Sequence, residues 1–260
     1  MILKKRIALN GVQLDAADSR ILIQNLETEA PNDQLSAVAQ WGGSGSRVTA
    51  AHRDYLGLNV KFGINEKTYN PAGRMTALEA AKAWACAGGW LTASWRPGRR
   101  IRVIPVKMPA DGDPGRRGTQ YTIGFRAYGV PYWQAEEPAI LRWTGVSHAS
   151  GTIGVEGSAQ TVVEAEFRNT SGGTIDSVHL SAGGSWLDLD DLGLGSGETL
   201  VIDHEDTGSR CVLRIRIGNR SVLGCRTGSD DLFVNPGSNG VSLSADGSGV
   251  LTFRCAGRYL

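Results

Sequence analysis

Short extended segments separated by turn-forming residues fill the second half of the chain, and this pattern restricts the fold more than any other feature. From residue 140 onward, apolar stretches recur with Gly, Asn, Asp or Ser between them. In Val163–Phe167 and Leu213–Ile217, apolar and charged residues alternate, so one face of each strand is core and the other is solvated. This spacing is typical of an antiparallel β-sandwich. The predicted strands are Ile140–Trp143, Ile153–Val155, Val162–Phe167, Ile175–Leu180, Thr199–Ile202, Val212–Ile217, Leu232–Phe233, Val241–Leu243 and Val250–Phe253.

The first half of the chain predicts further strands and one helix. Asn10-Gly11 between apolar stretches indicates a two-residue hairpin. The helix is expected over Ala77–Ala87, with Thr76 and Glu79 as a capping box in front of it and two glycines behind it. Further strands are expected at Ile21–Leu26, Leu56–Ile64, Trp90–Trp95 and Arg100–Val106.

A candidate arm lies between Leu35 and Tyr55, where two β-forming stretches flank a tip of small residues. A tip without core-forming side chains predicts a hairpin that projects from the body. Two interpretations stay open for it, a mobile surface loop and an arm that binds a neighbouring protomer. The tip lacks the GK[ST] ending of a phosphate-binding loop. The candidate arm residues are Trp41, Gly42, Gly43, Ser44, Gly45, Ser46 and Arg47.

A second candidate surface is basic and belongs to the hairpin around the turn RPGR. Ile101 and Val103 are expected on its buried face, and Arg100 and Arg102 on the other, with Arg99 beside them. Such a face suggests nucleic-acid binding, but neither interleaved exposed aromatic residues nor a known reading motif accompanies it. We therefore predict a partner-facing or solvated basic surface without specific nucleic-acid binding.

The segment Tyr121–Pro138 marks a change in the character of the chain. It begins as a strand and ends in a proline followed by an aromatic pair and two glutamates, which predicts a boundary between domains 1–133 and 134–260. Up to Val130 the chain has 18 Lys+Arg and 10 Asp+Glu; after it there are 9 and 16, with no lysine. This asymmetry predicts that the two halves face different surroundings.

Residue patterns for catalysis or metal binding are weak throughout. The histidines are scattered, no serine lies in a GxSxG motif, and Glu136-Glu137 would point to opposite faces of a strand. The acidic residues Asp188, Asp190 and Asp191 do not fit a calcium loop, and a solvated turn is expected there. The cysteines show no CxxC spacing. Cys211 and Cys225 could face each other across a hairpin that turns near Gly218-Asn219, but all four cysteines are expected to be reduced, buried packing residues. We predict no enzyme activity, no metal and no cofactor.

The N-terminus contains basic residues but no apolar run of signal-peptide length, and no run of about 18 apolar residues occurs in the chain. We therefore expect no membrane association. The protein is expected to stay in the cytosol where it is made, or to leave without a secretion signal.

Three stretches together resemble the distal tail protein family of long-tailed bacteriophages and related prophages. They are TALEAAKAWACAGGWLTASWRPGRRIRV, the boundary segment YTIGFRAYGVPYWQAEEP, and GETLVID with the ending DDLFVNPGSNGVSLSADGSGVLTFRCAGRYL. The ending is the most specific, with its PGSN turn and its final Arg-Tyr-Leu. The boundary departs from the usual pattern, because Gly-Val-Pro precedes the aromatic pair where Asp-Pro is commoner.

The resemblance implies a structural virion protein of the siphophage-type tail or baseplate hub. Its first domain would be a β-sandwich with one flanking helix, forming a homo-hexameric ring at the distal end of the tail tube. The hairpin Leu35–Tyr55 would clasp the neighbouring protomer. The second would be a galectin-like, carbohydrate-binding-module-like β-sandwich. Implied partners are the tail tube protein, a tail hub or tail-associated lysin-type protein, and receptor-binding or baseplate proteins. The implied location is the phage tail, assembled in the host cytoplasm.

Two other functions stay open. One is a carbohydrate-binding, lectin-like host-recognition protein built on the second domain, which would depend on a surface tryptophan. Beyond Trp133, that half contains only Trp143 and Trp186, at least one of which is expected in the core. The other is a glycan hydrolase, for which the sequence offers no suitable carboxylate pair.

Overall fold

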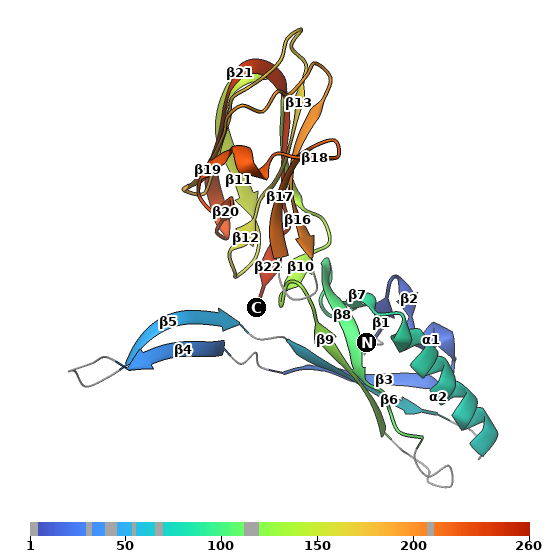
Figure 1. The fold of residues 1–260 in the computed structure, drawn as a ribbon. Helices are drawn as coiled ribbons and strands as arrows, with labels where there is room; N and C mark the ends of the chain where they lie inside the picture. Colours follow the sequence, from blue (N-terminus) through green and yellow to red (C-terminus); the bar gives the residue numbers. More distant parts are fainter. Residues whose placement is uncertain are drawn as a thin grey trace. The chain divides into compact units, whose positions relative to one another are not determined.

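The fold is shown by a computed structural model, which describes residues 5–29, 33–39, 46–53, 56–65, 70–111, 120–206 and 211–260 (Figure 1). The chain divides into two compact units, Met1–Tyr132 and Trp133–Leu260. Both consist mainly of antiparallel strands, so the predicted mostly β fold class is confirmed. The sequence placed a domain boundary directly after Trp133.

The first unit is built on one antiparallel sheet. Its strands are, in spatial order, β2 (Val12–Gln13), β1 (Ile7–Leu9), β7 (Gly89–Ala93), β8 (Arg99–Lys107), β9 (Gln120–Ala127), β6 (Gly57–Ile64) and β3 (Ile21–Thr28). The predicted hairpin at Asn10-Gly11 is confirmed, since both residues have positive φ and join β1 to β2. The Asn10 side chain also accepts a hydrogen bond from the Trp90 backbone N–H, which ties this turn to β7.

Period-two alternation decides which face of this sheet is buried. Leu58, Val60 and Phe62 of β6 are buried, and Tyr121, Ile123 and Phe125 are their register neighbours on β9. The helix α2 (Pro71–Cys86) lies against this face and buries Leu78, Ala81 and Trp84. The Trp84 ring meets the Phe125 ring edge to face, with centroids 6.1 Å apart. The core of the first unit therefore lies between α2 and one face of the sheet.

The start of α2 differs from the prediction. The helix begins at Pro71, and Asn70 caps it by accepting a hydrogen bond from the Gly73 N–H at 2.9 Å. Proline at the first helical position and asparagine before it are strong start signals. The capping box at Thr76 and Glu79 was therefore wrong, and Thr76 donates instead to the Ala72 carbonyl within the helix. A short helix, α1 (Leu14–Ala17), was not predicted.

A separate two-stranded sheet is formed by β4 (Asp33–Ala39) and β5 (Ser46–Arg53). The strands pair antiparallel from Asp33 opposite Arg53 to Ala39 opposite Ser46, with one register shift along the way. This is the predicted hairpin of the candidate arm.

The second unit has one continuous network of paired strands. In spatial order these are β18 (Arg220–Ser221), β17 (Cys211–Ile217), β16 (Thr199–Asp206), β13 (Glu164–Asn169), β21 (Gly237–Cys255), β14 (Val178–Ala182), β15 (Ser185–Leu189) and β19 (Arg226–Gly228), and β11 (Ala139–Val155) also pairs with β21. Two further pairs are β12 (Thr161–Val162) with β20 (Phe233–Val234), and β10 (Trp133–Ala135) with β22 (Arg258–Tyr259). A 3-10 turn, η1, spans Leu223–Cys225.

The two longest strands, β11 and β21, form a ladder that holds the second unit together. They pair from Ala139 opposite Cys255 to Val155 opposite Gly237, with register shifts around Val146. The sequence predicted two short strands in place of each, which was wrong. Small polar residues and Gly145 in the middle of β11 resemble a turn, but pairing with β21 keeps that stretch extended.

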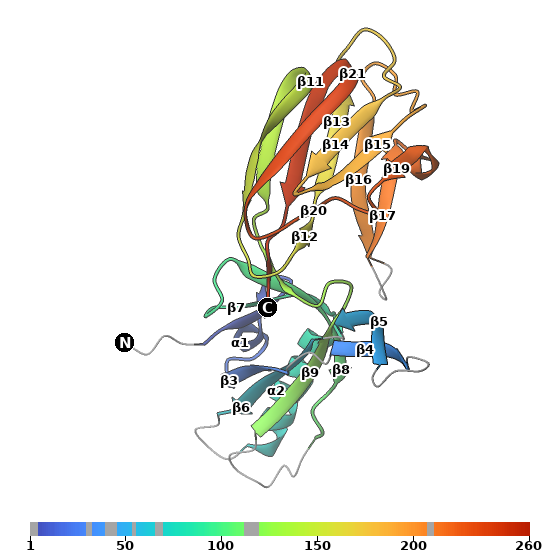
Figure 2. The same cartoon turned by 90° about the vertical axis from the view of Figure 1, so that its left-hand side faces the viewer.

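Pairing along β21 divides the network into the two layers of a sandwich (Figure 2). Its C-terminal half, near Leu251, pairs with β13 and leads on to β16 and β17. Its N-terminal half, near Leu243, pairs with β14 and leads on to β15 and β19. The inward side chains of both layers form one buried apolar cluster that includes Phe167, Leu180 and Phe253. The predicted sandwich of the second half is therefore confirmed.

The cysteines and histidines depart from the predictions in part. Cys86, Cys225 and Cys255 are free, but only Cys255 is buried, and Cys86 is exposed at the end of α2. Burial of the Cys255 thiol raises its pKa to about 12. His204 contacts Asp231 at 2.7 Å, an ion-pair geometry that the scattered histidine positions did not predict.

The core position of Leu251 can be tested against an exposed leucine of the same unit. Leu251 is 0% exposed between the layers, whereas Leu223 is 41% exposed. Leu251→Ala should lower the free energy of unfolding by about 2–5 kcal/mol, because it removes buried methyl groups and leaves a cavity. Leu223→Ala should change it by no more than about 0.5 kcal/mol. Urea unfolding followed by circular dichroism measures both, and equal effects would contradict this placement.

Asp203 on β16 predicts a pH dependence of stability. Burial raises its pKa, but hydrogen bonds from Arg214 at 2.9 Å and Arg216 at 3.2 Å outweigh burial and hold the pKa below the usual 3.8. Because the folded pKa is lowered, this stabilisation is complete above about pH 4 and is lost as the pH falls through the folded value. Asp203→Asn should therefore be less stable than the parent above about pH 4, and the difference should shrink in more acidic buffer. Thermal unfolding between acidic and neutral pH measures this, and a constant difference would refute it.

Candidate functional site

The candidate arm is a two-stranded ribbon whose outer edges are not used. Among the described residues, β4 and β5 pair only with each other, so each strand has one edge without a ladder partner. Ser46 and Arg47 begin β5, opposite Ala39 and Val38. The other predicted arm residues, from Trp41 to Gly45, lie outside the described residues. Unused edges of this kind can pair with a strand of another molecule.

The structure divides the three predicted arginines between two environments. Arg100 and Arg102 lie on the face of β8 opposite the buried Ile101 and Val103, as predicted. Arg99 has the opposite parity and starts the strand next to the turn. There, burial together with the Arg99 charge lowers the pKa of Arg96.

Aromatic rings lie under both arginines of this face. The Arg100 guanidinium is 4.2 Å from the centre of the Trp90 ring, and the Arg102 guanidinium is 4.6 Å from the centre of the Tyr128 ring. Both rings come from segments outside β8 and are half-buried, so they are not the interleaved exposed aromatic residues of a nucleic-acid-binding surface. Stacking on a ring fixes the plane of each guanidinium group and keeps its positive charge in place.

The same face of the sheet becomes apolar further along β8. Ile104 follows Arg102 with the same parity and is 43% exposed, and Val106, beyond an irregularity in the β8–β9 register, is 59% exposed. A face that combines stacked arginines with exposed aliphatic side chains resembles the composition of protein interfaces. We define Arg100, Arg102, Ile104 and Val106 as the β8 face.

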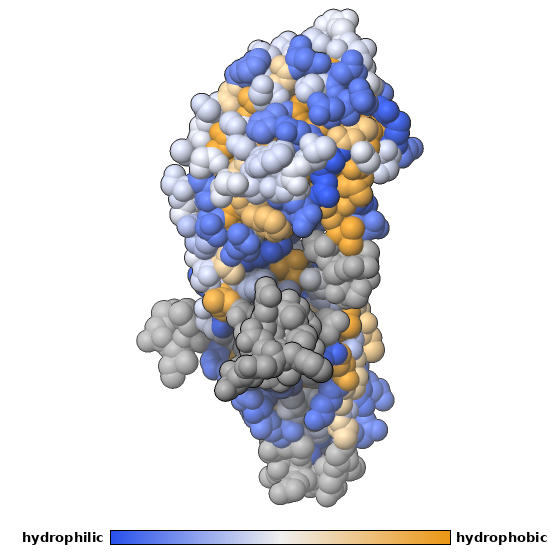
Figure 3. All heavy atoms as spheres, turned by 60° about the vertical axis from the view of Figure 1, so that its left-hand side comes forward, coloured by the Kyte–Doolittle hydropathy of each residue, from blue (hydrophilic) through white to orange (hydrophobic). Residues whose placement is uncertain are grey.

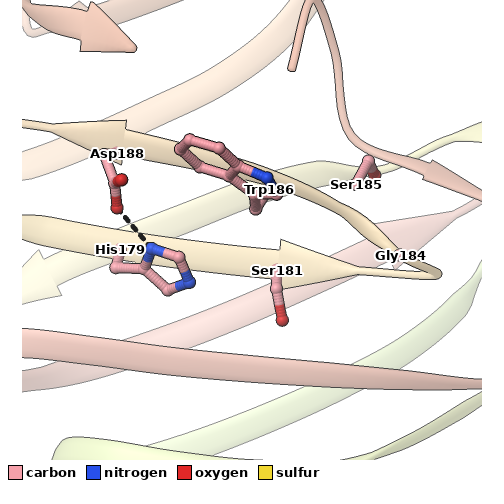
Figure 4. A pocket seen from close by; sticks show the side chains of 6 residues that line it. All are labelled: His179, Ser181, Gly184, Ser185, Trp186 and Asp188. Carbon is pink, nitrogen blue, oxygen red and sulfur yellow. Dashed lines mark hydrogen bonds and ion pairs between the residues drawn. The ribbon is translucent and has the colours of Figure 1, made fainter. Parts of the chain in front are cut away.

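The second unit has a shallow pocket on its outer surface, which the sequence analysis did not single out. Its volume is about 340 Å³, and its lining residues are His179, Ser181, Gly184, Ser185, Trp186 and Asp188. All belong to β14, β15 and the turn between them (Figure 4). The alternation of apolar and polar residues in both strands could have placed His179, Trp186 and Asp188 on one outer face.

The surface of the second unit is mixed in hydropathy. On the face shown in Figure 3, hydrophilic, intermediate and hydrophobic residues are interspersed over the second unit. At least one of Trp143 and Trp186 was expected in the core; Trp143 packs against it, and Trp186 is exposed.

Metal binding has no support within the described ranges, where no group of three or more His, Cys, Asp or Glu side chains could hold an ion. Asp188 contacts His179, whereas Asp190 accepts a hydrogen bond from the Ser177 hydroxyl at 3.1 Å. Asp191 has a φ of 56° in the turn that follows β15. The three acidic residues therefore do not converge on one point. Across the described residues, no helix is both long enough and apolar enough to cross a membrane.

Comparisons with known proteins rest on structure alone. No protein-family model matches the chain, and no curated protein matches it. The crystal structure of SPP1 Dit (gp 19.1), described as a paradigm of the hub adsorption apparatus in phages infecting Gram-positive hosts, is similar with a TM-score of 0.67 and 14% identity. The match covers 98% of this chain and 99% of that one. A structure of the phage P2 baseplate in its activated conformation with Ca gives a TM-score of 0.49 and 7% identity over 98% of both chains.

The match to SPP1 Dit extends over both units and over nearly the whole length of each chain. At this level of identity the likeness concerns the fold. The chain therefore has the fold of SPP1 Dit, a phage hub protein.

Proposed function

We propose that this chain is a distal tail protein, a structural component of a bacteriophage tail without enzymatic activity. The observation that carries the proposal is the match to SPP1 Dit across 98% of the chain. A match limited to one unit would support only a shared domain. This match includes both units, in the same order along the chain. The protein would lie at the distal end of the tail tube, in virions assembled in the host cytoplasm.

In this proposal, six copies form a ring through the first unit. The ribbon β4–β5 supports this role because its edges have no ladder partner among the described residues. A strand edge that meets a strand of a neighbouring copy gains a ladder of backbone hydrogen bonds, and symmetry repeats the same contact around the ring. The ribbon would thus act as the clasp between protomers.

The β8 face would contact a second partner, the tail tube protein or a hub protein with a tail-associated lysin. Arg100 and Arg102 stack on aromatic rings, so they offer positive charge in fixed positions. This charge would attract acidic residues of the partner. The second half of the chain has a negative net charge and no lysine. In this proposal, the second unit carries receptor-binding or baseplate proteins.

The ring is tested by mass measurement with and without the ribbon. Native mass spectrometry of the full chain should detect an assembly of six 27.7 kDa subunits. Replacing residues 33–53 with a short Gly-Ser linker should give monomers, because the strand edges that join protomers are gone. The variant should keep its β-type circular dichroism, which serves as the folding control. A ring that survives the replacement would refute the clasp, and its absence even in assembled tails would refute the ring.

The β8 face is tested by charge reversal. Arg100→Glu with Arg102→Glu should weaken binding to the tail tube or hub protein by about tenfold or more at low salt, since two attractive contacts become repulsive. The matched control reverses Arg142 and Arg168, which are exposed in the second unit, and should leave this binding unchanged. Co-purification and titration at two salt concentrations measure the effect. Equal binding by both double variants would contradict the assignment.

A further inference from the structure

The pocket on β14 and β15 contains an exposed aromatic ring held in a fixed orientation. Trp186 is 42% exposed, although a large aromatic side chain on a strand surface usually finds cover. A Cβ atom at Gly228 would lie 2.5 Å from two atoms of the indole, so the ring rests directly on the backbone of β19. The indole also stacks on the His179 ring, with centroids 6.2 Å apart and an angle of 22°. Trp186 is therefore preorganised before any ligand arrives.

Polar groups lie on one side of the Trp186 ring. The Asp188 carboxylate contacts the His179 Nδ1, and the dashed line in Figure 4 marks this pair. One carboxylate oxygen suffices for that contact, which leaves Asp188 Oδ2 and His179 Nε2 to face a ligand. The His179 and Asp188 side chains are 40% and 37% exposed, so a ligand can reach both.

Serine hydroxyls extend the polar surface away from Trp186. The Ser181 hydroxyl is 2.7 Å from the Ser242 hydroxyl on β21, and either can donate. Ser244 is the register neighbour of His179 and lies on the same outer face of the sheet. Ser185, by contrast, is committed, because it accepts from the Phe233 N–H and donates to the Ala182 carbonyl, both at 2.7 Å. Because serine side chains are short, they leave the exposed face of the Trp186 ring accessible to a ligand.

From this arrangement we infer that the pocket is a binding subsite for one neutral pyranose unit of a glycan. The apolar C–H face of a pyranose would lie on the exposed indole, and its hydroxyls would donate to Asp188 and exchange hydrogen bonds with His179 and Ser181. An anionic ligand is disfavoured by the Asp188 carboxylate. The volume of about 340 Å³ fits one or two sugar rings and excludes a large ligand from full burial.

The inference goes beyond the proposed structural role and does not depend on ring formation. It assigns a ligand class to a surface of the second unit that contributes nothing to the ribbon or the β8 face. A hub protein with such a subsite would add weak contacts to a glycan, and several copies would multiply them.

The experiment uses the full chain and simple glycosides as probes. Methyl glycosides of glucose, galactose, rhamnose and N-acetylglucosamine are titrated, with saturation-transfer NMR and tryptophan fluorescence as readouts. At least one should bind with a dissociation constant on the order of 1 mM. Trp186→Ala should weaken that binding by at least tenfold, and Trp186→Tyr should restore part of it because a flat ring returns.

Trp95→Ala is the matched control, because Trp95 is a similarly exposed tryptophan in the first unit, and it should bind like the parent. Asp188→Ala should weaken binding without removing the ring stack. Thermal unfolding confirms that each variant is folded. Binding by none of the glycosides, or binding that Trp186→Ala leaves unchanged, would overturn the inference. If the parent bound no glycoside and the Trp186→Ala variant lost binding to a tail protein, the pocket would be a protein contact, and the inference would also be overturned.

Discussion

The ladder between β11 and β21 is the interaction on which the second unit depends. These two strands pair with each other over nearly their full length, which satisfies the backbone groups along one edge of β21. Because β13 joins one half of β21 and β14 joins the other, both layers are built on the same strand. Phe253 and Leu243 then point into a shared core from opposite layers. The register of β21 thus determines how both sheets pack. It also sets the positions of the residues on β14 that line the outer pocket.

The first unit depends on a different constraint, the covering of one sheet face by α2. Alternation along β6, β8 and β9 directs apolar side chains toward the helix, and the other face keeps its arginines and exposed aliphatic residues. An antiparallel sheet can pack one face on its core and keep polar side chains on the other. Within the described ranges, the two units therefore present different chemistry: arginines stacked on aromatic rings in one, and a face with serine hydroxyls and the exposed Trp186 indole in the other.

Local patterns in the sequence predicted what depends on neighbouring residues. The Asn10-Gly11 turn, the alternation in β9 and the short strands of the second half were readable because side-chain period and turn chemistry are local. The joining of Ile140–Trp143 and Ile153–Val155 into one strand was not readable, since only the distant partner β21 keeps the polar stretch between them extended. Alternation alone could place the strand residues of the pocket on one outer face, but the support of Trp186 by Gly228 comes from another part of the chain. The rings beneath Arg100 and Arg102 likewise come from other segments, and cross-strand register brings Trp90 beside β8.

The pairing of β10 with β22 has a mechanical consequence. Trp133 lies opposite Tyr259, so the segments that enter and leave the sandwich run side by side in opposite directions. Tension applied between these two residues would load the hydrogen bonds between β10 and β22 one after another, instead of loading all of them in parallel. The same direction of pull would next reach the pair Ala139 and Cys255. The sandwich would therefore yield progressively from this end, while force applied across its layers would meet the whole interlocked core together.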